Sequence, residues 1–133
     1  MKIGVSSTGK DLDAQVDPRF GRCSYFLIVD TETMSFESIS NESAMASGGA
    51  GIRAAQTVAK EGVKVVITGN VGPNAFQTLS AAGIKVFTVT FGSIKEAIEK
   101  YKKGELRETE AASVSSHYGM GGRGRGFGGG RKI

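Results

Sequence analysis

The chain has 133 residues, of which 39% are hydrophobic and 23% are charged, and it contains a single cysteine. This length and composition predict one globular domain. No apolar run approaches the roughly 18 to 20 residues of a membrane helix, and no signal-peptide core follows Met1. We therefore expect a cytoplasmic protein with no membrane contact. One cysteine excludes an internal disulfide and a complete four-cysteine metal site within one chain.

The net charge of +4 is confined to the C-terminal end of the chain. All 13 acidic residues precede residue 111, and four of the 17 basic residues follow residue 117. The body of the chain, residues 1–110, therefore holds 13 acidic and 13 basic residues and has no net charge. Eight of the 15 residues from Gly119 to Ile133 are glycine, and such a segment cannot bury enough apolar surface to offset its ordering entropy. We therefore predict a domain over residues 1–110 and a disordered tail over 111–133, first Ser-rich and then Gly/Arg-rich.

The first half of the body predicts three strands and one helix. Apolar runs indicate strands over residues 2–7, 24–30 and 34–40, the last two joined as a hairpin. A glycine-rich stretch then leads into a helical pattern, in which Ile52, Ala55 and Val58 lie on one face and Gly62 ends the helix.

The second half alternates strands with helices. The β-branched run over 63–68 predicts a strand covered on both faces. Next come a helix over 74–82 with Pro73 in its first turn, a strand over 84–89, and a helix that Ser93 caps and that runs to Lys103. This order predicts an α/β fold with a mixed five-stranded sheet flanked by helices, the connectivity of ribonuclease H-like folds.

Catalysis has little support in these residues. The first predicted strand lacks the carboxylate that a two-metal nuclease of this fold would need. The single histidine, His117, lies in the predicted tail, so no base accompanies Cys23 as a nucleophile. We expect that the protein is not an enzyme.

Two glycine-rich loops favour a binding site. Gly49 and Gly51 open a predicted helix, while Gly69 and Asn70 lie between a strand of parallel type and the next helix, where open α/β sheets commonly bind ligands. Helix starts with free N–H groups favour anions. The alternative is that these glycines only permit tight turns.

The turn over residues 17–23, Asp-Pro-Arg-Phe-Gly-Arg-Cys, is the second candidate. It places an exposed-looking Phe20 and two arginines, Arg19 and Arg22, near Cys23. Guanidinium groups would favour a thiolate and attract an anionic ligand. The alternative is a loop in which Cys23 is a small buried side chain.

Several segments of residues 1–108 together resemble one family. They are Lys2-Ile3-Gly4-Val5-Ser6, Arg19-Phe20-Gly21-Arg22 before Tyr25-Phe26-Leu27-Ile28-Val29, Gly48-Gly49-Ala50-Gly51, the segment from Val65 to Ala75, and Gly83-Ile84-Lys85-Val86. The chain resembles the dinitrogenase iron-molybdenum cofactor biosynthesis family, whose members are similar in fold to ribonuclease H. Arg19 stands where cofactor-carrying relatives have a histidine implicated in holding the cluster, while Cys23 matches their cysteine.

The resemblance implies a non-catalytic binding or carrier protein for an iron–sulfur-type metal cluster or an iron-molybdenum cofactor precursor, with Cys23 as metal ligand. The cofactor-binding residues expected on these grounds are Arg19, Phe20, Gly21, Arg22, Cys23, Gly49, Gly51, Gly69 and Asn70. A preformed cluster brings its own sulfides, so one or two protein ligands suffice. The expected partners are cofactor donor or acceptor proteins, and the chain is either a monomer or a homodimer.

The tail supports an alternative function, an RNA-binding or protein-interaction module. Arginines spaced by glycine can pair with phosphates, and Phe127 can stack on a base. This alternative predicts salt-sensitive nucleic-acid binding that disappears when residues 117–133 are deleted.

Overall fold

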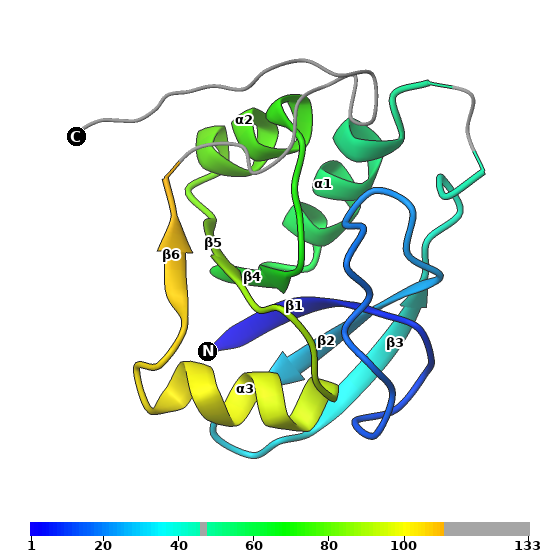
Figure 1. The fold of residues 1–133 in the computed structure, drawn as a ribbon. Helices are drawn as coiled ribbons and strands as arrows, with labels where there is room; N and C mark the ends of the chain where they lie inside the picture. The colour runs from blue at the N-terminus through cyan, green and yellow to red at the C-terminus, as the bar shows by residue number, and fades with distance from the viewer. Residues whose placement is uncertain (46–47, 111–133) are drawn as a thin grey trace.

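The computed structural model describes residues 1–45 and 48–110. The predictions for the tail, including its disorder, His117, Phe127 and RNA binding, lie outside the described residues. The elements are β1 (Lys2–Ser7), β2 (Tyr25–Asp30), β3 (Phe36–Ser40), α1 (Ala50–Lys60), β4 (Val65–Thr68), α2 (Pro73–Ala81), β5 (Lys85–Thr88), α3 (Ile94–Lys102) and β6 (Arg107–Thr109). The sheet order is β3-β2-β1-β4-β5-β6, with α1 and α2 on one face and α3 on the other (Figure 1).

The pairing directions confirm a mixed sheet flanked by helices. β1 pairs parallel with β4 and antiparallel with β2, and β4 pairs parallel with β5. The predicted number of five strands is wrong, because β6 adds a sixth strand antiparallel to β5. β6 has the sequence Arg-Glu-Thr, which shows no apolar alternation, so only its pairing reveals it. The ribonuclease H-like assignment stays a prediction.

The central strands separate two apolar clusters. All four residues of β4 are buried, as its uninterrupted β-branched run predicts. Val66 belongs to the cluster beneath α1 and α2, whereas Ile67 belongs to the cluster beneath α3. Because β1, β4 and β5 run in the same direction, their carboxyl ends meet at one edge of the sheet. In the part of the chain that is described, no helix is long and apolar enough to cross a membrane.

The start of α3 is fixed by a capping box. Ser93 accepts a hydrogen bond from the backbone N–H of Glu96 at 3.1 Å, and the Glu96 carboxylate accepts one from the backbone N–H of Ser93 at 2.9 Å. These two bonds satisfy two N–H groups that the helix itself leaves without partners. The spacing of Ser93 and Glu96 thus explains why the helix begins where the sequence predicts.

Replacing Ser93 with alanine is expected to lower the free energy of unfolding by about 1 kcal/mol, because the helix loses its side-chain cap. The measurement is urea unfolding followed by circular dichroism. Ser80→Ala is the matched control, since Ser80 is an exposed residue of α2. Equal losses in the two variants would contradict the capping role.

Candidate functional site

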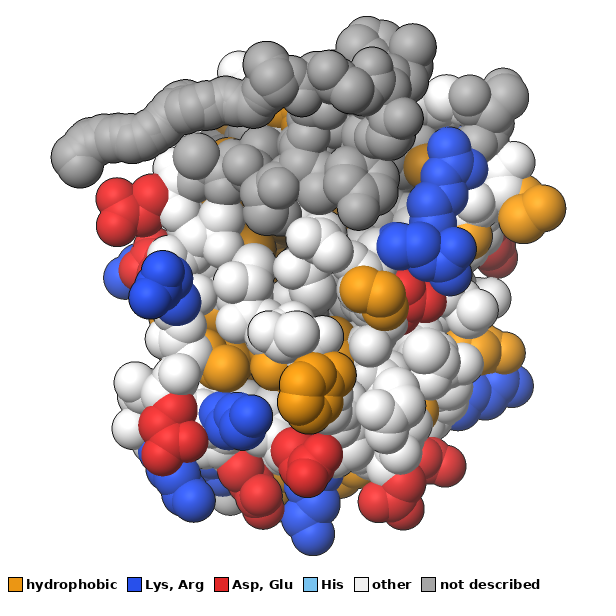
Figure 2. Space-filling model, in the orientation of Figure 1, with side chains coloured by type: hydrophobic (Ala, Val, Ile, Leu, Met, Phe, Trp, Pro, Cys, Tyr) orange, Lys and Arg blue, Asp and Glu red, His pale blue; other side chains and the backbone are white. Residues whose placement is uncertain are grey.

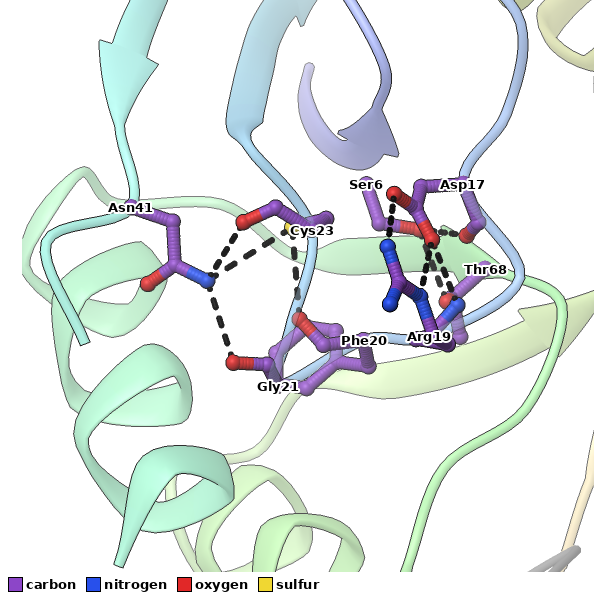
Figure 3. A network of polar contacts seen from close by, with 8 residues as sticks. All are labelled: Ser6, Asp17, Arg19, Phe20, Gly21, Cys23, Asn41 and Thr68. Atoms are coloured by element: carbon purple, nitrogen blue, oxygen red, sulfur yellow. Dashed lines mark hydrogen bonds and ion pairs between the residues drawn. The ribbon is translucent and has the colours of Figure 1, made fainter. Parts of the chain in front are cut away.

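The turn over residues 17–23 crosses the carboxyl ends of β1 and β4. The hydroxyl of Ser6 in β1 donates to the backbone carbonyl of Asp17 at 2.7 Å, and the backbone N–H of Asp17 donates to the Ser6 carbonyl at 2.9 Å. Further along, the backbone N–H of Phe20 donates to the Asn70 carbonyl at 3.3 Å, just after β4. The turn therefore lies at the edge of the sheet where open α/β proteins bind ligands (Figure 3).

Three glycines let this turn and the two helices approach one another closely. A Cβ on Gly69 would lie 2.6 Å from Cα of Pro18, and one on Gly21 would lie 3.0 Å from Cα of Gly51. A Cβ on Gly51 would lie 3.2 Å from Cβ of Ala75 in α2. The glycines thus have a packing role whatever ligand they meet.

A groove of about 360 Å³ opens where the turn meets the starts of α1 and α2. Its lining residues are Gly21, Arg22, Gly48, Gly49, Ala50, Gly51, Ile52, Gly72, Pro73, Asn74 and Ala75. We call this space the glycine groove. It brings together Gly21, Arg22, Gly49 and Gly51 from the predicted set.

The glycine groove favours negative charge. The N-cap residues of α1 and α2 are Gly49 and Gly72, which have no side chain to offer to the first-turn N–H groups. Two helix starts with positive partial charge therefore face one space. Among the described residues that line the groove, Arg22 is the only charged one. Figure 2 shows basic side chains gathered at the upper right, with an acidic side chain next to them, over the region where Figure 1 places the turn.

The other predicted residues lie elsewhere. Gly69 and Asn70 line a second pocket of about 220 Å³, together with Pro18, Thr88, Val89 and Thr90. Phe20 is 2% exposed, which contradicts its exposed appearance in the sequence, and its ring packs 5.1 Å from that of Phe26. Arg19 is paired with Asp17. The predicted site thus divides into a groove, a pocket, a buried layer between strands and helices, and the exposed side chain of Arg19.

Cys23 belongs to the buried layer. Its side chain is 0% exposed, and its thiol donates to the Phe20 carbonyl at 3.3 Å. The amide nitrogen of Asn41, just after β3, lies 3.8 Å from the sulfur and donates to the Cys23 carbonyl at 2.9 Å. Burial raises the pKa of the thiol to about 12. The expectation that neighbouring arginines favour a thiolate stays a prediction, and in this structure Arg19 pairs with Asp17 instead.

The buried thiol is expected to resist alkylation by iodoacetamide in the native protein and to react once the chain unfolds, because only the thiolate attacks. Mass spectrometry with and without urea checks this. Rapid alkylation of the native protein would contradict the buried position.

The stability of the protein should depend on the ionisation of Cys23. The pKa of the thiol in the folded protein lies above the ordinary value of 9.0, so the unfolded chain loses this proton first. The free energy of unfolding should consequently fall as the pH rises from 9.0 to about 12, and less steeply in Cys23→Ala.

Sequence reasoning missed part of the groove. Asn74 and Ile52 are both exposed and both line it, yet neither residue type indicates ligand binding by itself. The available signal was the pair Gly72-Pro73, which marks a second helix start like that at Gly49. Only the packing of α1 against α2 shows that the two starts share one groove.

Comparison with known proteins gives one family match and several similar structures. The family described as dinitrogenase iron-molybdenum cofactor matches residues 1–104. The chain is similar to the apo form of the orange protein from Desulfovibrio gigas, with 44% identity, a TM-score of 0.82, and coverage of 84% of this chain and 95% of that one.

The chain is similar to two further proteins. A Thermotoga protein described as a candidate NifB protein shows 42% identity and a TM-score of 0.72, covering 80% of this chain and 91% of that one. An uncharacterised protein of Methanocaldococcus jannaschii is 33% identical over 99 residues, which is 72% of this chain and 84% of the relative.

Proposed function

The chain belongs to the dinitrogenase iron-molybdenum cofactor family, and from that membership we propose that it is a non-catalytic carrier of a preformed metal cluster held in the glycine groove. The cargo class is an iron–sulfur-type cluster or an iron-molybdenum cofactor precursor. Family membership and the similarity to the orange protein support a cofactor-binding or carrier role. The kind of cluster and its exchange with donor or acceptor proteins are our proposal.

The lining of the glycine groove supports this proposal. The glycine groove combines two helix starts with glycine N-caps and the charged residue Arg22, and its described lining contains no carboxylate. Iron–sulfur clusters held by thiolates or sulfides are commonly anionic, so this surface complements their charge. A guanidinium group adds donors in a fixed planar arrangement.

The residues suit a cluster with its own ligands better than a bare metal ion. Across residues 1–45 and 48–110, no group of three or more His, Cys, Asp or Glu side chains is placed to hold a metal. Cys23 is buried and its pKa is raised to about 12. Cys23 as a metal ligand stays a prediction, and it would require the turn over residues 17–23 to open. We therefore propose that Gly21, Arg22, Gly49 and Gly51 hold the cargo through hydrogen bonds and charge.

Anaerobic incubation with two probes tests the proposal. One probe is a synthetic [4Fe–4S] cluster with four thiolate ligands, and the other is isolated iron-molybdenum cofactor. After gel filtration, visible absorption and paramagnetic resonance are recorded for the wild type and for Cys23→Ala. We expect a near-stoichiometric signal from at least one probe in both proteins.

Two results would contradict the proposal. A signal lost in Cys23→Ala, with unfolding unchanged, would make Cys23 a ligand and contradict binding by the groove alone. No signal from either probe in either protein would contradict the carrier function.

A further inference from the structure

Arg19 faces the protein's own carboxylate. Its Nε lies 3.3 Å from Oδ1 of Asp17, and its Nη2 lies 3.4 Å from Oδ2 (Figure 3). The backbone N–H of Arg19 also donates to Oδ1 of Asp17 at 2.9 Å. Arg19 is not among the described residues that line the glycine groove. Its charge is therefore directed at Asp17.

The Asp17 carboxylate is stabilised by the Arg19 guanidinium. Its side chain is only 4% exposed, while that of Arg19 is 66% exposed. A buried carboxylate is costly unless it is paired and hydrogen-bonded, so removal of the guanidinium leaves a charge in an unfavourable place. The bond also raises the pKa of Arg19, which stays charged at any physiological pH.

The backbone of Asp17 is bonded to β1 at the point where a side-chain bond links β1 to β4. The Asp17 N–H donates to the Ser6 carbonyl, and the Ser6 hydroxyl donates to the Asp17 carbonyl. The same hydroxyl lies 2.8 Å from that of Thr68 at the end of β4. The base of the turn is thus fixed at the sheet edge (Figure 3). From there the chain passes Arg19 and then reaches the lip of the glycine groove at Gly21 and Arg22.

We propose that Asp17 and Arg19 form an internal clamp that positions Gly21 and Arg22 for the cargo, and that Arg19 itself does not contact the cargo. Both members of the clamp are positioning residues. The inference rests on the proposed function, since the cargo is the cluster proposed above.

A salt series separates positioning from contact. The affinity for the synthetic [4Fe–4S] cluster is measured at low and high salt for the wild type, Arg19→Gln and Arg22→Gln. Arg53→Gln is the control, because Arg53 is an exposed arginine of α1 outside the groove lining. Salt weakens attraction between charges that face each other through solvent. We expect Arg22→Gln to show a shallower salt dependence. Arg19→Gln should bind roughly tenfold more weakly, with the salt dependence of the wild type, and Arg53→Gln should bind as the wild type.

A double-mutant cycle tests the pairing. Once Asp17→Asn has removed the carboxylate, Arg19 has nothing to clamp, so Arg19→Gln should cause no further loss of affinity. Arg19→Lys keeps the charge and should recover part of the affinity. Independent losses in the cycle, or a salt dependence of Arg19→Gln as shallow as that of Arg22→Gln, would overturn the clamp.

A readout without cargo keeps this inference separate from the carrier function. In the cargo-free protein, the amide signals of Gly21 and Arg22 should shift in Arg19→Gln and in Asp17→Asn, and remain unchanged in Arg53→Gln. Unshifted signals would overturn the clamp even if the wild type binds clusters. If the wild type binds neither probe but the two variants show these shifts, the clamp is supported and the carrier function is contradicted.

Discussion

Asn74→Glu is expected to abolish most cluster binding while leaving the fold intact. Asn74 is exposed, lines the glycine groove and is the second residue of α2. A carboxylate in the first turn of a helix is favourable by about 0.3 to 1 kcal/mol, so the folded state should not suffer. The same charge repels an anionic cargo by about 4 kcal/mol at a separation of about 4 Å near a protein surface. We therefore expect more than a tenfold loss of affinity.

Gln77→Glu is the matched control for this experiment. Gln77 is exposed on the same helix and carries the same change of charge, but it is not among the described residues that line the groove. Titration with the synthetic cluster and thermal unfolding are run on both variants. Wild-type affinity in Asn74→Glu would place the cargo elsewhere. An equal loss in both variants would indicate a general effect of net charge and would contradict a specific groove.

Gly69→Ala is expected to cause the largest loss of stability. The added Cβ would lie 2.6 Å from Cα of Pro18, 2.9 Å from its Cβ and 3.2 Å from its carbonyl oxygen. These are backbone and ring atoms, which cannot rotate away as a long side chain can. Overpacking of this kind costs about 1 to 3 kcal/mol or more, because the turn must move from the sheet edge.

Gly48→Ala supplies the comparison for Gly69→Ala. A Cβ on Gly48 would meet no atom of the described residues within 4 Å. Urea unfolding should show a midpoint close to that of the wild type for Gly48→Ala and a much lower one for Gly69→Ala. A Gly69→Ala protein as stable as the wild type would show that the turn does not pack against the end of β4 in the way described.

The elements with a local signature were predicted well. The run at β4 contains only β-branched residues, and the Ser93 to Glu96 spacing defines the start of α3. β6 has three residues and no apolar pattern, and it exists because β5 offers an edge for pairing. A strand defined by its partner cannot be read from its own residues.

The candidate site was predicted only in part, because its residues come from three separate segments. The glycine loops were recognised, but the reason for Gly21 and Gly51 is a close approach between the turn and α1, which depends on tertiary packing. Asp17 attracted no notice, since Asp before Pro is a common turn sequence. Its burial follows from where the turn crosses β1 and β4. The same crossing places Cys23 in the core.

The position of the cargo on the protein can be mapped by nuclear magnetic resonance. Amide signals of the isotope-labelled wild type are followed by nuclear magnetic resonance while the synthetic [4Fe–4S] cluster is added anaerobically. A cluster bound in the glycine groove is expected to cause selective shifts or paramagnetic broadening at Gly21, Gly49, Gly51 and Asn74, with β6 unaffected. Changes centred elsewhere, or no change at saturating cluster, would contradict a cluster site in the glycine groove.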